Sequence, residues 1–209
     1  LLGIEGSCTT LGSSATSLLQ IACELCCGFG ESRSADITGY FPNFSFFATF
    51  SVAYHSGVKI GWYDLDPDTH MPTLSDLTHN PKFIYLTVPF GSDKILEYIE
   101  FAKSMDSFVI IDAAACLPTI IHQNIKLTQI PKNVIIVFSL HATKLINSGE
   151  GGLMVFGQDV PQHAQNLTNF GLNHQRIQFW PGSFNAKMSE FNAAAGLASL
   201  DDARSNISK

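Results

Sequence analysis

The apolar residues of this chain fall into short runs with two kinds of spacing. Residues 13–27 put apolar side chains at positions 18, 19, 22, 23 and 26, which is the spacing of one helical face. Continuous apolar runs bounded by Gly, Pro, Asn or Asp indicate buried strands. We expect helices at 13–27, 45–57, 92–105, 160–170 and 188–203, strands at 36–42, 58–65, 82–88, 108–111, 133–138 and 152–156, and a loop at 171–187.

This alternation of strands and helices predicts an α/β fold with three layers, α/β/α, around a mostly parallel central sheet. The chain has 209 residues, enough for one sizeable core, and shows no internal repeat, linker or low-complexity tract. We therefore expect a single domain over residues 1–209.

Composition narrows the classes of function. Apolar residues make up 45% of the chain and charged residues only 14%, so we expect much of its surface to be buried in a core or against a partner subunit. The net charge is −6 and no basic run exceeds two residues, which argues against binding nucleic acid or an anionic membrane. No apolar run approaches the ~20 residues of a membrane span.

The five cysteines are expected to be reduced thiols in a cytoplasmic protein. Cys23, Cys26 and Cys27 cluster on the first predicted helix, and no second CxxC or nearby His completes a zinc set. Asp64, Asp66 and Asp68 have the spacing of a calcium loop. The glycine and glutamate that such a loop needs are replaced by Thr69 and Ser75, so we expect a turn followed by a helix. No metal is expected.

The residues whose side chains could bind a ligand or take part in a reaction follow the predicted strands. Asp112 comes after the strand at 108–111, and Ser139 and Lys144 come after the strand at 133–138. Ligands of α/β sheets bind outside the carboxyl ends of the strands. The start of the first helix, around Ala15 and Thr16, offers free amide N–H groups to an anion.

Lys144 is open to two interpretations from the residues alone: a solvated loop lysine, or a partly desolvated amine that acts as a nucleophile. A lysine, an aspartate, an anion site and spare aromatic rings together match the needs of pyridoxal 5'-phosphate. The lysine would bind the cofactor covalently, the aspartate would keep its ring nitrogen protonated and the helix would hold its phosphate.

Five ordered motifs make the sequence similar to the DegT/DnrJ/EryC1/StrS family of sugar aminotransferases, which have the type I fold of pyridoxal-phosphate enzymes. The best of them is FSLHATKLINSGEGG at 138–152, which resembles the family's F-S-F-H-x-T-K-x-x-x-x-G-E-G-G. The others are PNFSFFAT at 42–49, WYDLDPDT at 62–69, VIIDAAA at 109–115 and GSFNAKMSEFNAAAGLASL at 182–200.

The resemblance implies a role for each matching residue. Lys144 would form the Schiff base and move protons, and Asp112 would pair with the pyridinium nitrogen. Phe46 would stack on the ring with Thr49 nearby. The phosphate would be bound by Ala15, Thr16 and Ser139, and by Asn185 from the neighbouring subunit of a homodimer with shared active sites. His141 either lines the site or is a histidine with a structural role.

The implied reaction transfers an amino group from an amino acid, expected to be glutamate, to a nucleotide-linked keto sugar. A sugar dehydratase on the same fold would carry His in place of Lys144. Ala115 departs from the family, which has His or Gln beside the phenolic oxygen of the cofactor. The chain resembles the large domain alone, with the segment before the first helix and the small C-terminal domain expected to be missing. A non-catalytic dimerisation or cofactor-binding module is therefore an open alternative.

Overall fold

The computed structural model describes residues 2–28, 37–72, 81–172, 180 and 182–207. The strands are β1 (Thr9–Gly12), β2 (Thr38–Pro42), β3 (Lys59–Tyr63), β4 (Phe83–Thr87), β5 (Phe108–Asp112), β6 (Val134–Ser139) and β7 (Gly152–Phe156). The helices are α1 (Ala15–Cys27), α2 (Phe47–His55), α3 (Ile95–Lys103), α4 (Leu117–His122), α5 (Gln162–Thr168), α6 (Glu190–Asp201) and α7 (Ala203–Ile207). A short 3₁₀ turn, Pro89–Gly91, follows β4.

The described strands form one seven-stranded sheet in the order β1-β7-β6-β5-β4-β2-β3. The pairs β2–β3, β2–β4, β4–β5 and β5–β6 are parallel, whereas β7 runs antiparallel to both of its neighbours, β6 and β1. The predicted mostly parallel α/β sheet is confirmed. The edge strand β1 and the short helix α4 were not predicted.

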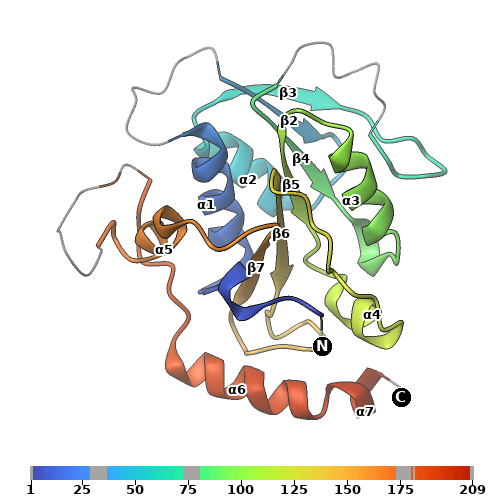
Figure 1. Cartoon of the computed structure of the whole chain (residues 1–209), viewed down its shortest axis with the longest axis vertical. Coiled ribbons are helices and arrows are strands. Elements are labelled where there is room, and N and C mark those ends of the chain that lie inside the picture. Colours follow the sequence, from blue (N-terminus) through green and yellow to red (C-terminus); the bar gives the residue numbers. More distant parts are fainter. Residues whose placement is uncertain (1, 29–36, 73–80, 173–179, 181, 208–209) are drawn as a thin grey trace.

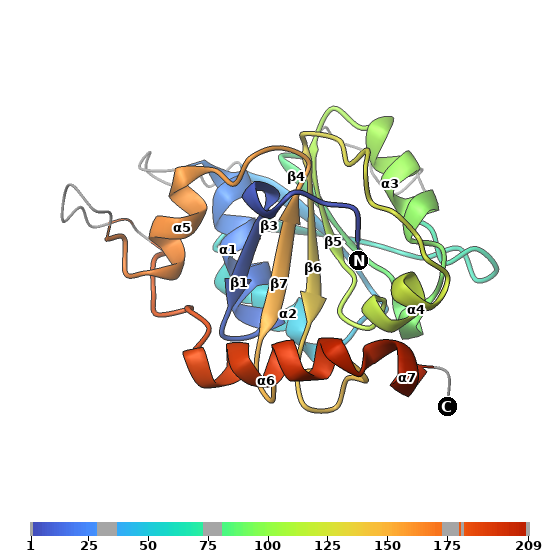
Figure 2. The same cartoon turned by 60° about the horizontal axis from the view of Figure 1, so that its bottom comes forward.

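Helices cover both faces of the sheet, as Figures 1 and 2 show. One core lies beneath α1, α2 and α5, and includes Leu18, Val52 and Leu167. The other lies beneath α3, α4 and α7, and includes Ile99 and Ile120. Strands β4, β5 and β6 are buried almost throughout because both of their faces meet helices. Fully burying one such aliphatic side chain stabilises the fold by about 1.5–3 kcal/mol.

Helix α6 lies across one end of the sheet rather than on either face (Figure 2). It passes beside the turn that joins β6 to β7, and Asn192 and Ser199 of α6 hydrogen-bond to that turn. The turn thus has support from a segment about fifty residues further along the chain.

The predicted elements agree with the observed ones to within a few residues. Two expectations extend beyond the described residues. They are residue 36, at the start of the strand predicted at 36–42, and the helix expected after the aspartate turn at 64–69. The predicted loop at 171–187 lies partly outside them. None of the helices in the described part of the chain is long and apolar enough to cross a membrane.

Candidate active site

A cavity of about 750 Å³ opens at the edge of the sheet where β4, β5 and β6 end. Thr87, Asp112 and Ser139 are the last residues of those three strands, and all of them line it. The start of α1, the loop before α2 and the turn after β6 complete the wall. The lining residues used below are Ser14, Ala15, Thr16, Phe44, Ser45, Phe46, Thr87, Phe90, Asp112, Ala115, Ser139, His141, Thr143, Lys144, Glu150 and Gly151.

Asp112 is a buried carboxylate on the cavity wall, with an exposed fraction of 4%. Its Oδ1 accepts a hydrogen bond of 3.0 Å from the backbone N–H of Ala114, and its Oδ2 accepts one of 2.9 Å from the Tyr85 hydroxyl. Burial raises the pKa of Asp112 above its ordinary value, while these two hydrogen bonds and the charge of Lys144 oppose that rise. The charged form of Asp112 is therefore stabilised by the hydrogen-bond donors and the positive charge around it.

Lys144 lies in the turn between β6 and β7, on the same cavity as Asp112. Its backbone N–H donates to the His141 carbonyl at 2.8 Å, and its carbonyl accepts from the Asn147 side chain at 3.0 Å. Its side chain is only half-buried. The backbone of the turn thus fixes where the Lys144 side chain begins, and Lys144 lines the cavity.

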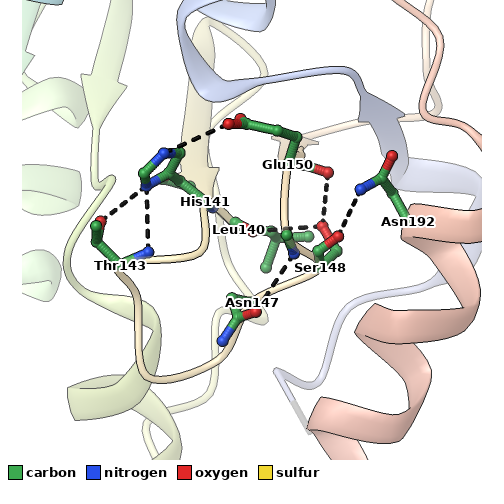
Figure 3. Close-up of polar contacts among 9 residues, drawn as sticks. Leu140, His141, Thr143, Asn147, Ser148, Glu150 and Asn192 are labelled. Carbon is green, nitrogen blue, oxygen red and sulfur yellow. Dashed lines mark hydrogen bonds and ion pairs between the residues drawn. The ribbon is translucent and has the colours of Figure 1, made fainter.

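Close backbone pairing holds the lysine turn together (Figure 3). The N–H of Ser148 donates to the Leu140 carbonyl at 2.8 Å, and the Ser148 hydroxyl donates to the Glu150 carbonyl at 2.9 Å. From α6, the Asn192 amide donates to the Ser148 carbonyl at 2.7 Å. A Cβ on Gly151 would lie 2.4 Å from the Ser148 hydroxyl oxygen and 2.4 Å from the terminal carbon of Met188, so both side chains pack closely against this glycine.

His141 lies between Thr143 and Glu150 at the cavity wall (Figure 3). Its Nδ1 accepts the backbone N–H of Thr143 at 3.2 Å, and the Thr143 hydroxyl lies 2.8 Å from the same nitrogen. The proton is therefore on Nε2, which faces the Glu150 carboxylate at 3.4 Å. His141 both lines the site and braces the turn, so the two interpretations left open by the sequence are compatible.

The first turn of α1 faces the cavity with backbone N–H groups that have no acceptor within the helix. Ser14 caps the helix by accepting the Ser17 N–H at 3.1 Å, and Ser17 in return accepts the Ser14 N–H at 3.2 Å. The first i to i−4 bond of the helix runs from Leu18 to Ser14. The N–H groups of Ala15 and Thr16 precede it and have no acceptor within the helix. Together with the positive end of the helix dipole they suit an anion.

Thr49 and Asn185 are the two predicted site residues that are not among the described residues lining this cavity. Thr49 is fully buried, and its hydroxyl lies 3.5 Å from that of Tyr85. Asn185 is exposed, and its side chain accepts from Lys187 at 2.9 Å. The other predicted residues, Ala15, Thr16, Phe46, Asp112, Ser139 and Lys144, all line the cavity.

Three side chains at or behind the cavity were not singled out from the sequence: Ser45, Tyr85 and Thr87. Each lies in a run that looks like ordinary core or turn sequence. The one signal available was positional, since Thr87, like Phe90, lies next to the carboxyl end of a predicted strand. Phe90 has a left-handed backbone (φ 53°), which is uncommon for a bulky residue and typical of functional loops.

All five cysteines are free thiols, and burial raises the pKa of Cys23 and of Cys116, the latter to about 12. Among the residues that the structure describes, no group of three or more His, Cys, Asp and Glu could hold a metal ion. The Asp66 carboxylate accepts the Thr69 N–H at 2.7 Å and the Asp68 N–H at 3.1 Å, which makes the expected turn.

The donor set of the cavity fits pyridoxal 5'-phosphate. An amine (Lys144) and a carboxylate (Asp112) line the same space as the first N–H groups of α1 and the Ser139 hydroxyl. Phe46 adds an aromatic ring that is 73% exposed. Ala115 lines the cavity as well and offers no side-chain donor. These are the groups that a ring nitrogen, an aldehyde and a phosphate require.

Comparison with known proteins gives a consistent result. The sequence model of the DegT/DnrJ/EryC1/StrS aminotransferase family matches residues 5–209. The chain is 28% identical over 208 residues to GDP-perosamine synthase from Escherichia coli O157:H7, covering 96% of this chain and 55% of that protein. It is also 28% identical over 169 residues to protein Rv3402c of Mycobacterium tuberculosis H37Rv, covering 76% of this chain and 40% of that protein.

Solved structures agree on the fold. DesI, crystallised in the presence of its TDP-sugar product, superposes with a TM-score of 0.76 at 25% identity, covering 98% of this chain and 50% of DesI. An aminotransferase from Brucella abortus superposes with a TM-score of 0.74 at 20% identity, covering 98% of this chain and 56% of that one. The chain thus spans about half the length of the relatives it matches.

Proposed function

This chain belongs to the DegT/DnrJ/EryC1/StrS aminotransferase family, and from that premise we propose that it transfers an amino group from glutamate to a nucleotide-linked keto sugar with pyridoxal 5'-phosphate as cofactor. One observation carries the proposal: Lys144, Asp112 and the first turn of α1 line a single cavity at the carboxyl edge of the sheet. DesI, with its TDP-sugar product, and GDP-perosamine synthase support a nucleotide sugar as the acceptor.

When bound, the cofactor supplies an aldehyde that bonds to amines and a ring that withdraws electrons from the attached carbon. In our proposal Lys144 Nζ would bind the cofactor at its aldehyde carbon and would also move protons to and from the substrate. Asp112 keeps the proton on the ring nitrogen. The N–H groups of Ala15 and Thr16 and the Ser139 hydroxyl bind the phosphate, and Phe46 covers the ring.

We further propose a cytoplasmic homodimer with shared active sites. The side chain of Asn185 is exposed and is not among the described residues of its own cavity, which suits a role in a neighbouring site. Phe46, Phe47 and Tyr54 on and beside α2 are 73%, 82% and 80% exposed, a group of aromatics that a partner subunit would cover. Five free thiols suit a reducing compartment.

Ala115 favours a second candidate, a cofactor-binding and dimerisation module without turnover. Its methyl group offers the phenolic oxygen of the cofactor no hydrogen bond, and that bond tunes the electronics of the ring. The two candidates differ in what the bound cofactor does when an amino donor is added.

The test is spectroscopic. The purified chain is incubated with pyridoxal phosphate, its visible absorbance is recorded, and glutamate is added without a keto acceptor. An aminotransferase gains a visible band that glutamate then removes, and Lys144→Ala abolishes the band. Lys103→Ala, an exposed lysine of α3 paired with Glu100, serves as the control and should behave as the unmodified chain. Absence of the band in the unmodified chain overturns the proposal, whereas a band that glutamate leaves unchanged favours the second candidate.

A further inference from the structure

A line of hydroxyl groups begins at the cavity wall, with Thr87 and Ser45, and runs through buried residues to Asp112. Thr87 Oγ1 lies 2.9 Å from Ser45 Oγ, which lies 2.6 Å from Thr49 Oγ1. Thr49 Oγ1 lies 3.5 Å from the Tyr85 hydroxyl oxygen, and Tyr85 donates to Asp112 Oδ2 at 2.9 Å. Thr49 and Tyr85 have no exposed surface, so bulk solvent does not reach the part of the line that these two residues form.

Strand geometry explains why Tyr85 reaches the carboxylate. Thr87 of β4 is the register partner of Asp112 of β5, and Tyr85 is the partner of Ile110. Side chains two residues apart on a strand share a face, so Tyr85 and Asp112 are diagonal neighbours on the face covered by α1 and α2. A tyrosine is long enough to span that diagonal, and the phenol ends at the carboxylate.

The direction of the hydrogen bonds follows from the number of protons. An ionised carboxylate only accepts, and each hydroxyl has one proton to donate. Tyr85 gives its proton to Asp112, so it accepts from Thr49. Thr49 then accepts from Ser45, and Ser45 accepts from Thr87. Every hydroxyl dipole in the line therefore points toward the negative charge, and the contact between Thr49 and Tyr85, at 3.5 Å, is the longest in the line.

Both carboxylate oxygens are thus held from the protein side, Oδ1 by the Ala114 N–H and Oδ2 by Tyr85. These two bonds fix the plane of the group and leave further lone pairs for a donor inside the cavity. Burial works against the charged form of Asp112, and the donors oppose that effect.

We propose that Tyr85 is the positioning residue for Asp112: its hydroxyl, oriented by Thr49, fixes the carboxylate so that the ring nitrogen of the bound cofactor stays protonated. This inference rests on the proposed pyridoxal phosphate function and adds to it two residues that do not themselves line the cavity. The seven-residue run KFIYLTV marks Tyr85 as ordinary core, and its role follows from the hydrogen bonds alone.

Nitrogen-15 NMR of the chain loaded with ring-labelled pyridoxal phosphate tests the inference, because the chemical shift of the ring nitrogen reports its protonation directly. Tyr85→Phe removes one hydroxyl and keeps the ring. We expect its resonance to move toward that of the unprotonated nitrogen, and the rate constant of the glutamate half-reaction to fall about tenfold or more. Tyr63→Phe is the matched control, since Tyr63 is equally buried and its hydroxyl donates to the Tyr85 carbonyl at 2.6 Å instead of to the carboxylate.

A second pair of variants keeps the test decisive if Tyr85→Phe fails to fold. Thr49→Val removes the hydroxyl that orients Tyr85, and Thr49→Ser retains it. We expect the nitrogen resonance to shift in the valine variant and to return in the serine variant. Identical resonances and rates in Tyr85→Phe and Tyr63→Phe, or in the two Thr49 variants, would overturn the inference. Failure of the unmodified chain to form the visible band would instead count against the proposed function.

Discussion

A Cβ added to Gly152 would lie 2.8 Å from the backbone nitrogen of Ala15. The first residue of β7 and the first residue of α1 therefore touch through their backbones, with no room for a side chain between them. Gly152 is also the register partner of Ser139 on β6. This contact brings the first N–H groups of α1 and the Ser139 hydroxyl to the same corner of the cavity, where we propose that the phosphate binds.

Gly152→Ala should therefore weaken cofactor binding and lower the stability of the fold. The added methyl group meets backbone atoms that cannot rotate away, so α1 must shift. Overpacking of this kind costs about 1–3 kcal/mol. Urea unfolding and a titration of pyridoxal phosphate measure the two effects. Gly6→Ala is the control, because a Cβ there has no neighbour within 4 Å. Equal affinities of the two variants for pyridoxal phosphate would contradict the proposal that the phosphate binds at this corner of the cavity.

Ser14→Ala removes the cap of α1 and should lower the free energy of unfolding by about 1 kcal/mol. It should also weaken phosphate binding, since the capping box holds the first turn in place. Ser189→Ala is a matched control: Ser189 caps α6 by accepting the Asn192 N–H at 3.1 Å and is not among the described residues of the cavity. We expect a similar loss of stability there with unchanged cofactor affinity. If both variants bind the cofactor equally well, the α1 terminus does not hold the phosphate.

Phe46→Ala should reduce cofactor affinity with little effect on folding. The ring is 73% exposed, so its removal leaves almost no core defect, and loss of one aromatic stack costs about 0.5–1.5 kcal/mol. Phe191 on α6 is 90% exposed and is not among the described residues of the cavity, which makes Phe191→Ala the control. Thermal unfolding together with quenching of protein fluorescence by the cofactor separates the two quantities. An equal or larger loss of cofactor affinity in Phe191→Ala would contradict the role given to Phe46.

Asp112→Asn should make the cofactor-free chain more stable at neutral pH. Burial raises the pKa of Asp112, so the folded chain holds the proton to higher pH than the unfolded chain does. Stability is then lost as the pH rises from the ordinary carboxyl pKa to the raised one, and the full loss persists above it. The amide carries no charge and avoids this loss.

We therefore expect a higher melting temperature for Asp112→Asn at neutral pH, with the gain vanishing below the ordinary carboxyl pKa. Asp159→Asn, at an exposed position, changes the net charge equally and is the control. A gain that persists in acid would mean that Asp112 affects stability through something other than its charge.

The sequence predicted the layered fold because buried parallel strands are continuous apolar runs and amphipathic helices have a regular spacing. It missed β1, whose four residues include one large apolar side chain, Leu11, and which is a strand only because β7 offers it an antiparallel edge. It missed α4 as well, a helix of six residues with Pro118 in its first turn.

The candidate site was predictable where a residue follows a strand, as for Asp112, Ser139 and Lys144. Tyr85 was not predictable, because a tyrosine inside an apolar strand is expected to be a core residue. Only the register of β4 and β5 shows that it lies beside a carboxylate. Thr49 shares a helix with residues of the cavity but points behind the wall, and helical position alone does not distinguish those two directions.

The most direct test of the central claim is to find where the cofactor attaches. The chain is loaded with pyridoxal phosphate, reduced with borohydride, digested and analysed by mass spectrometry. Our account predicts one stoichiometric modification, on Lys144, that disappears in Lys144→Ala. Modification spread over surface lysines such as Lys59 and Lys103, with Lys144 unmodified, would contradict it.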